Sequence, residues 1–80
     1  MKSDKDRRLI RLVKIIMILA QGSFNSKRFA TEERCSWRTV QRDIRDLEFA
    51  GFPLQKQYNG SWVLDEDFKT YGFRKFMPGK

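Results

Sequence analysis

Apolar side chains recur at helical spacing in the first part of the chain, up to about Gln21. Ser3 or Asp4 can cap this helix, and Gly22 with the polar residues after it ends it. The i, i+3, i+4, i+7 spacing predicts one stripe of residues that faces the core. This stripe consists of Leu9, Leu12, Val13, Ile16 and Leu19 or Ala20.

The same helix carries more apolar residues than one stripe requires. The additional ones are Ile10, Ile15, Met17 and Ile18. Because a surface helix needs only one apolar stripe, the excess predicts a second buried contact. Two coverings remain open at this point: Phe24 with the aromatic residues near the C-terminus, or a partner subunit.

Two further helices are predicted before the pattern changes. A short, strongly charged helix spans about Ser26 to Arg34, with Phe29 and Ala30 facing inward. A third helix runs from Trp37 to Ala50, because Ser36 can accept hydrogen bonds from the free amides of its first turn. A glycine directly after this helix, and a proline two residues later, end it.

The period changes from helical to alternating after the third helix. The segments Leu54–Tyr58 and Ser61–Leu64 flank Asn59-Gly60. Asn-Gly tolerates the positive φ values of a type I′ turn, so a β-hairpin is predicted here. Alternation places one of Trp62 and Val63 inward. The fold class is therefore α+β and mostly α, with three helices followed by a hairpin.

The last segment, from Asp65 onward, gives no clear regular element. Its acidic start, Asp65-Glu66-Asp67, is interpreted as a solvated cluster and not as a metal site. Its aromatic residues, Phe68, Tyr71, Phe73 and Phe76, are predicted to pack on the first helix or to join a dimer interface. Residues 1–67 are thus expected to form one domain, and residues 68–80 an aromatic and basic tail.

Composition narrows the possible functions. The 80 residues suffice for one small domain, and 17 Lys and Arg against 10 Asp and Glu give a net charge of +7. The chain has no histidine, which excludes histidine-based triads and histidine metal ligands. The single cysteine, Cys35, excludes an internal disulfide and suits a reducing cytosol; core packing is its expected role. We expect a cytoplasmic protein that is not an enzyme and needs no cofactor or metal.

The positive charge points to a polyanionic partner rather than to a membrane. The longest apolar stretch is interrupted by Arg11 and Lys14 and is shorter than the ~20 residues that a membrane span requires. A helix lying on anionic lipid would use the first helix, but it leaves the features of the third helix and the hairpin unexplained.

The third helix carries the most informative pattern in the sequence. At 100° per residue, its apolar face consists of Val40, Ile44 and Leu47. The opposite face is basic and consists of Arg38, Arg42 and Arg45. Asp43 and Asp46 lie apart from the line of arginines, so they do not neutralise it.

These side chains suit nucleic acid. The planar fork of arginine binds a phosphate, or the O6/N7 edge of guanine, with two hydrogen bonds. Gln41 can pair in the same way with adenine, whereas Ser36 and Thr39 at the helix start suit a backbone phosphate. Trp37 either contacts thymine methyls and sugars or packs on the second helix. A solvated basic face that serves only solubility is the alternative.

The run from Cys35 to Leu54 resembles the recognition helix and following turn of DeoR-type winged helix-turn-helix domains, as found at the N-terminus of bacterial WYL-domain transcriptional regulators. It contains the pattern Ser-x-Arg-Thr-Val-x-Arg-Asp-Ile-x-x-Leu, followed by glycine, a bulky residue, proline and leucine. The resemblance covers residues 7–67. It implies sequence-specific binding of double-stranded DNA and control of transcription, with repression as the expected mode. A winged-helix module that binds another protein, and not DNA, is the alternative.

The resemblance also implies which residues face DNA. On the third helix these are Ser36, Trp37, Arg38, Thr39, Gln41, Arg42 and Arg45; on the hairpin, which would be the wing, they are Lys56 and Tyr58, with Gln57 nearby. Because one such unit contacts one half-site, we expect a homodimer formed through the first helix and the C-terminal tail.

The chain departs from the family pattern before the third helix. Glu33 and Arg34 stand where the family usually has leucine and glycine. Arginine adopts a positive φ at a higher cost than glycine, so a different turn geometry is expected. The acidic Glu33 in an apolar position also predicts a shortened or shifted second helix.

Overall fold

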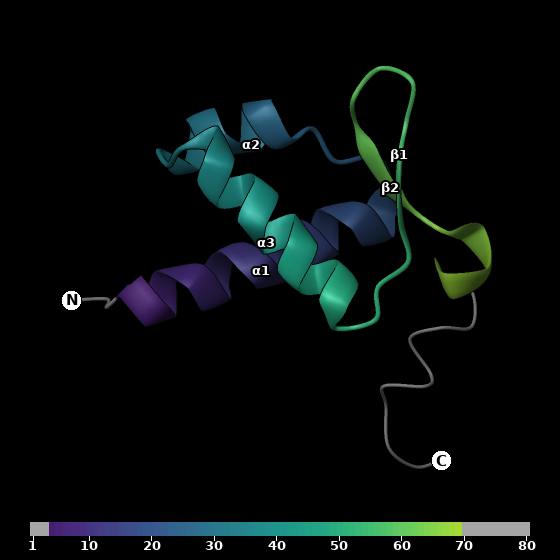
Figure 1. The fold of residues 1–80 in the computed structure, drawn as a ribbon, viewed down its shortest axis with the longest axis horizontal. Helices are drawn as coiled ribbons and strands as arrows, with labels where there is room; N and C mark the ends of the chain where they lie inside the picture. The colour runs from purple at the N-terminus through teal and green to yellow at the C-terminus, as the bar shows by residue number, and fades with distance from the viewer. Residues whose placement is uncertain (1–3, 70–80) are drawn as a thin grey trace, which may run out of the picture.

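The computed structural model describes residues 4–69, which form three helices followed by two strands (Figure 1). The elements are α1 (Asp4–Gln21), α2 (Ser26–Glu33), α3 (Trp37–Phe49), β1 (Leu54–Lys56) and β2 (Trp62–Leu64). The order and the mostly helical content confirm the predicted α+β winged helix-turn-helix layout. None of the helices among residues 4–69 is long and apolar enough to span a membrane.

The helices α2 and α3 begin at side-chain caps. The side chain of Asn25 accepts a hydrogen bond from the backbone N–H of Arg28 at the start of α2, at 3.0 Å. The predicted cap of α3 is confirmed, because Ser36 Oγ accepts from the N–H of Thr39 at 3.0 Å. Each cap satisfies an amide that the helix itself leaves without a partner.

The turn between α2 and α3 is built on a left-handed residue. Arg34 has φ 56° and ψ 43°, and its N–H donates to the carbonyl oxygen of Thr31 at 3.2 Å. Cys35 N–H donates to Ala30 O at 3.0 Å. Arg34 therefore adopts the conformation that glycine usually supplies at a helix end, and the expected change of turn geometry is wrong. Glu33 stays in α2, which ends one residue before the predicted end.

The core lies where the three helices and the hairpin meet. In Figure 1, α3 crosses α1, and the hairpin lies beside the C-terminal ends of these two helices. The rings of Phe24 and Phe29 pack in a tilted arrangement within this core, with centroids 5.0 Å apart and planes at 59°. The buried apolar residues are Ile15, Leu19, Phe24, Phe29, Ala30, Val40, Ile44, Leu47 and Leu64.

The predicted core stripe of α1 is wrong in part. Ile15 is fully buried, although the pattern placed it on a surplus face, and Leu19 is buried as predicted. Leu9 and Val13 are 62% and 49% exposed, although the pattern placed them in the core. The reason is that Arg11 faces α3, so the buried face of α1 includes a charged residue whose alkyl stem packs like an apolar one.

The hairpin forms where it was predicted, but with a different turn. Leu54 pairs with Leu64, and Lys56 pairs with Trp62, in antiparallel register. Gly60 has φ 90°, whereas Asn59 does not have the positive φ that a type I′ turn requires. Instead, Gly60 N–H donates to Gln57 O at 2.9 Å, which closes a β-turn over residues 57–60 whose last residue, Gly60, has the positive φ. The type I′ prediction is therefore wrong.

The connection between α1 and α2 is bound to the second strand. Phe24 and Trp62 exchange two backbone hydrogen bonds of 2.8 Å, so the hairpin gains a third, one-residue partner. Trp62 packs against the core on the same side as the buried Leu64, so Trp62 is the inward residue of the pair Trp62 and Val63.

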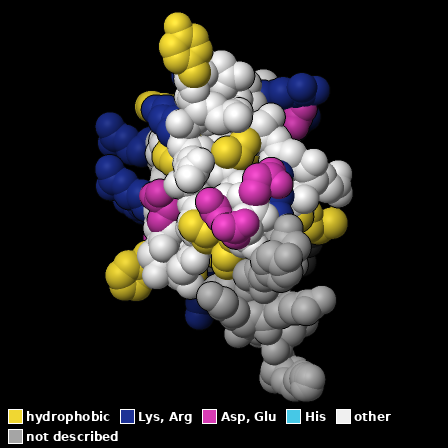
Figure 2. Space-filling model, turned by 90° about the vertical axis from the view of Figure 1, so that its right-hand side faces the viewer, with side chains coloured by type: hydrophobic (Ala, Val, Ile, Leu, Met, Phe, Trp, Pro, Cys, Tyr) yellow, Lys and Arg dark blue, Asp and Glu magenta, His cyan; other side chains and the backbone are white. Residues whose placement is uncertain are grey.

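The acidic segment after β2 begins a short helical turn at residues 66–69. Asp65 caps it by accepting a hydrogen bond from the N–H of Asp67 at 3.1 Å. Phe68 packs edge-on against Phe52, with centroids 5.5 Å apart. Figure 2 shows acidic side chains in the middle of this end of the molecule and basic ones at its margins. Among residues 4–69, no cluster suits a metal ion; the predicted roles of Tyr71, Phe73 and Phe76 lie outside the described residues.

Candidate nucleic-acid interface

The outer face of α3 carries three exposed arginines. Arg38, Arg42 and Arg45 all lie opposite the buried residues Val40, Ile44 and Leu47. Within residues 4–69 none of the three forms an ion pair. We call these three residues the arginine face. Their guanidinium groups are available to an anion from outside the chain.

Two of the three acidic residues of α3, Asp43 and Asp46, are held by α1. Arg11 Nε donates to Asp43 Oδ2 at 2.7 Å, and a second bond of 3.3 Å joins Arg11 to Asp43 Oδ1. Arg8 forms an ion pair with Asp46 in the same way. The hydrogen bond to Asp43 raises the pKa of Arg11. Because both carboxylates are turned toward α1, they do not neutralise the arginine face, as was predicted from the spacing.

A buried hydroxyl of α2 holds two predicted interface residues. Ser26 is 5% exposed, and its Oγ accepts from Trp37 Nε1 at 3.1 Å and from Gln41 Nε2 at 3.2 Å. Trp37 also has Lys27 Nζ 5.8 Å from its ring centroid, yet it stays 48% exposed. Trp37 therefore packs on α2, one of its two predicted roles. No spacing in the sequence indicates Ser26, because eleven residues and a turn separate it from Trp37.

Ser26→Ala is expected to destabilise the domain by about 1–3 kcal/mol, because two donors lose their acceptor in a part-buried place. Thermal denaturation followed by circular dichroism measures this loss. Ser23→Ala, at an exposed position in the preceding connection, is the control and should leave the midpoint unchanged. Equal midpoints for the two variants would contradict the role assigned to Ser26.

The start of α3 and the hairpin contribute further polar groups. The hydroxyls of Ser36 and Thr39 lie 2.8 Å apart at the first turn of α3. A hollow of about 230 Å³ between α2, the start of α3 and the hairpin brings Lys56 close to Trp37 and Gln41. Tyr58 lies near the end of the hairpin and is fully exposed, outside this hollow. Trp37 and Gln41 of α3 thus share one hollow with Lys56 of the hairpin.

Cys35 follows the left-handed turn residue and packs against the core, as predicted. Burial raises the pKa of its thiol, an effect that the nearby Arg11 partly opposes. The sulfur is consequently protonated at neutral pH, where a thiol is a poor nucleophile. Cys35 therefore serves packing within this site.

Comparison of the chain with protein-family models, with curated proteins and with solved structures finds no match. The resemblance to DeoR-type domains consequently stays a prediction that rests on the residues of α3 and the turn after it.

Proposed function

We propose that this chain is a sequence-specific double-stranded DNA-binding regulator of transcription that inserts α3 into the major groove. One observation carries the proposal: three arginines line the exposed face of α3 without an ion-pair partner among residues 4–69, while Asp43 and Asp46 of the same helix are bound to α1. Like charges so placed repel one another in the free protein, and a polyanion relieves that repulsion.

The polar groups divide into two roles. Arg38, Arg42 and Gln41 discriminate bases, since arginine pairs with guanine and glutamine with adenine. The bond from Gln41 to Ser26 uses one N–H and leaves the amide oxygen and the other N–H for a base. The groups that contact the backbone are Ser36, Trp37, Thr39, Arg45, Lys56 and Tyr58. Repression is the simplest outcome, because a protein that only occupies its site blocks other proteins there.

Selection from a random duplex library tests this proposal directly. A preferred sequence should emerge, and the logarithm of its binding constant should fall linearly with the logarithm of the salt concentration, by about 0.9 for each phosphate neutralised. Binding to all duplexes alike would remove the sequence-specific part. No duplex binding at low salt would reject the proposal and favour the protein-interaction module, for which an acidic partner is expected on the arginine face.

We also propose that two copies pair through α1. Leu9, Val13 and Met17 are 62%, 49% and 58% exposed, and together with the exposed Ala20 they form the α1 apolar stripe. A second copy would bury this stripe and would supply the second half-site that specific complexes of this kind use. The contribution predicted for the C-terminal tail lies outside the described residues.

Met17→Glu is expected to shift the chain to monomer, because it places a charge in the middle of the α1 apolar stripe. Sedimentation equilibrium at a series of concentrations measures the change, expected to be at least tenfold in the dimer dissociation constant. Gln55→Glu adds the same charge at an exposed strand position and is the matched control. A wild-type chain that stays monomeric at all concentrations would contradict the dimer.

A further inference from the structure

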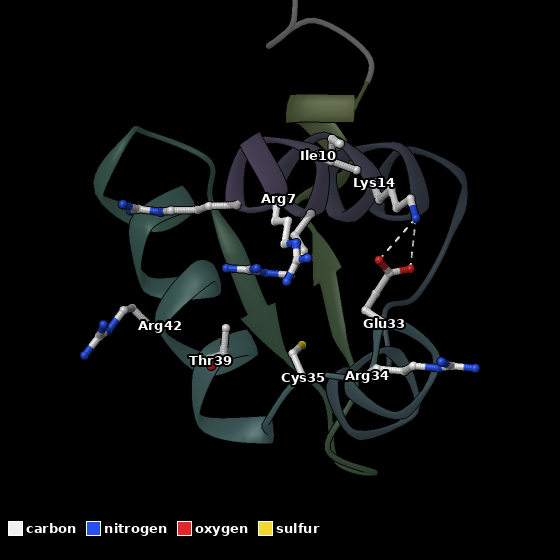
Figure 3. A pocket seen from close by; sticks show the side chains of 10 residues that line it. Arg7, Ile10, Lys14, Glu33, Arg34, Cys35, Thr39 and Arg42 are labelled. Atoms are coloured by element: carbon white, nitrogen blue, oxygen red, sulfur yellow. Dashed lines mark hydrogen bonds and ion pairs between the residues drawn. The ribbon is translucent and has the colours of Figure 1, made fainter. Parts of the chain in front are cut away.

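A second basic surface lies beside α3, away from the hairpin. It is a hollow of about 800 Å³ between α1, the turn after α2, and α3 (Figure 3). We call it the basic hollow. Its cationic lining residues are Arg7, Arg8, Arg11, Lys14, Arg34 and Arg42, and its only acidic lining residue among the described part of the chain is Glu33.

Half of these cations are already neutralised within the protein. Arg8 pairs with Asp46, Arg11 with Asp43, and Lys14 Nζ with Glu33 at 3.0 Å. The other half, Arg7, Arg34 and Arg42, form no ion pair among residues 4–69. The basic hollow therefore keeps a net charge of about three positive units that the described residues leave uncompensated.

Arg7, Arg34 and Arg42 surround the opening of the basic hollow. In Figure 3, Arg7 lies over the middle, whereas Arg34 and Arg42 stand at opposite edges with their guanidinium groups directed outward. Thr39, from the first turn of α3, contributes to the wall between them. An enclosed small ligand would need convergent groups, but divergent groups around an open rim suit an extended anion with several charges.

The backbone of Arg34 supplies an independent argument. Among residues 4–69, Arg34 is the only residue other than glycine with a positive φ. A side chain in the left-handed conformation costs free energy that glycine would avoid, and such strained residues gather at functional sites. Arginine at this turn is therefore unfavourable for folding, while it places a cation on the rim of the basic hollow.

We propose that the basic hollow is a second phosphate-binding site, which takes backbone phosphates of the same duplex next to the groove occupied by α3. This inference rests on the proposed function. The hollow is continuous with the arginine face, because Arg42 belongs to both. A duplex carries one charge per ~1.7 Å of axis, so an extended row of phosphates is present beside any helix in its groove. DNA is thus the source of phosphate that the position of the hollow favours.

Arg34→Gly provides a test in which stability and binding move in opposite directions. The midpoint of thermal unfolding should rise, because glycine adopts the left-handed conformation without strain. The affinity for the selected duplex should fall about 5- to 10-fold near 0.1 M salt, and the salt slope should decrease by about 0.9, the effect of one lost phosphate contact. A residue with a purely structural role would not lower affinity while raising stability.

Two more variants complete the experiment. Arg7→Ala should lower the affinity and the salt slope in the same way without raising the midpoint. Arg28→Ala removes one exposed cation from α2 outside the hollow and should change neither quantity beyond twofold. If Arg34→Gly and Arg7→Ala bind the duplex like the wild type, the inference is overturned and the proposed function stands.

Titration with inorganic pyrophosphate distinguishes the sources of phosphate. Under the proposal, pyrophosphate binds the wild type weakly and is displaced by the duplex. If the wild type binds pyrophosphate but no duplex, and Arg34→Gly weakens that binding, the phosphate site stands with a free phosphorylated ligand, and the proposed function fails. If the wild type binds neither, both fail.

Discussion

Asp43→Ala should lower the free energy of unfolding of the domain far more than any substitution on the surface of α3. Asp43 is 1% exposed and accepts two hydrogen bonds from Arg11, whose side chain is 17% exposed. Breaking a fully buried pair costs ~3–5 kcal/mol, and the remaining access of Arg11 to water reduces this to about 2–4 kcal/mol. In a domain of this size each kcal/mol shifts the unfolding midpoint by about 4–8 °C, so a fall of more than 8 °C is expected.

Thermal unfolding of three variants separates this ion pair from ordinary surface charge. Asp46→Ala breaks the neighbouring pair with Arg8, whose side chains are 37% and 52% exposed, and should cost less than about 1 kcal/mol. Arg11→Met combined with Asp43→Leu should recover much of the loss, because it leaves no charge without a partner. If Asp43→Ala and Asp46→Ala lowered the unfolding midpoint equally, burial would not decide the strength of these ion pairs.

The ion pair between Arg11 and Asp43 should keep its contribution to stability through the alkaline pH range. The hydrogen bond to Asp43 raises the pKa of Arg11 above its usual value. A base whose pKa is raised by folding contributes stability that is fully present below its unfolded pKa and is lost only above it. Loss of the Arg11 charge therefore does not weaken the fold at any pH used to measure DNA binding.

Replacing Arg38, Arg42 and Arg45 together by alanine is expected to weaken binding of the selected duplex by at least 100-fold. A contact to a base or phosphate of this kind contributes about 1–3 kcal/mol, and all three residues are exposed on one face. The salt slope should decrease by about 0.9, because only Arg45 of the three is assigned to a phosphate, whereas loss of Arg38 and Arg42 should remove the preference for the selected sequence. Electrophoretic mobility shift over a series of salt concentrations measures both quantities.

A triple replacement by lysine is the matched control for charge. Lysine keeps the positive charge but lacks the planar fork, so the salt slope should persist while the preference for the selected sequence falls. Both triple variants should keep the circular dichroism spectrum of the wild type, because the side chains make no ion pair within residues 4–69. Wild-type affinity in the alanine variant would remove the arginine face from the interface.

The α3 pattern was predictable because one helix face is apolar and the opposite face charged. Val40, Ile44 and Leu47 have no apolar competitors on the outer face apart from Phe49, which lies at the end of the helix and is 95% exposed. The cap at Ser36 was predictable for a similar reason, since capping depends on residues three positions apart. Local chemistry decides both features.

The buried face of α1 was not predictable from spacing, because apolar residues occupy nearly the whole circumference of its second half. The position of Arg11 decides which face turns inward, and its partner Asp43 lies 32 residues away. The role of Ser26 was not predictable for the same reason, since it accepts hydrogen bonds from Trp37 and Gln41, which lie on another helix. Contacts between distant segments carry information that periodicity within one helix does not contain.

The turn conformations show a different limit of prediction from the sequence. Asn59-Gly60 correctly indicated a hairpin, but the loop is one residue longer than the two-residue turn that the dipeptide favours. At Arg34 the packing of α2 against α3 imposes a conformation that the residue itself disfavours. Tertiary contacts outweigh a local preference of this size, so the basic hollow could not be placed from the sequence alone.

The two backbone bonds between Phe24 and Trp62 have a mechanical consequence. Phe24 immediately precedes Asn25, which caps α2, and the next residue, Ser26, anchors two side chains of α3. A displacement of β2 is thus passed through three successive residues, Phe24, Asn25 and Ser26, to α3. We therefore expect that replacing the hairpin alone would also shift the position of α3.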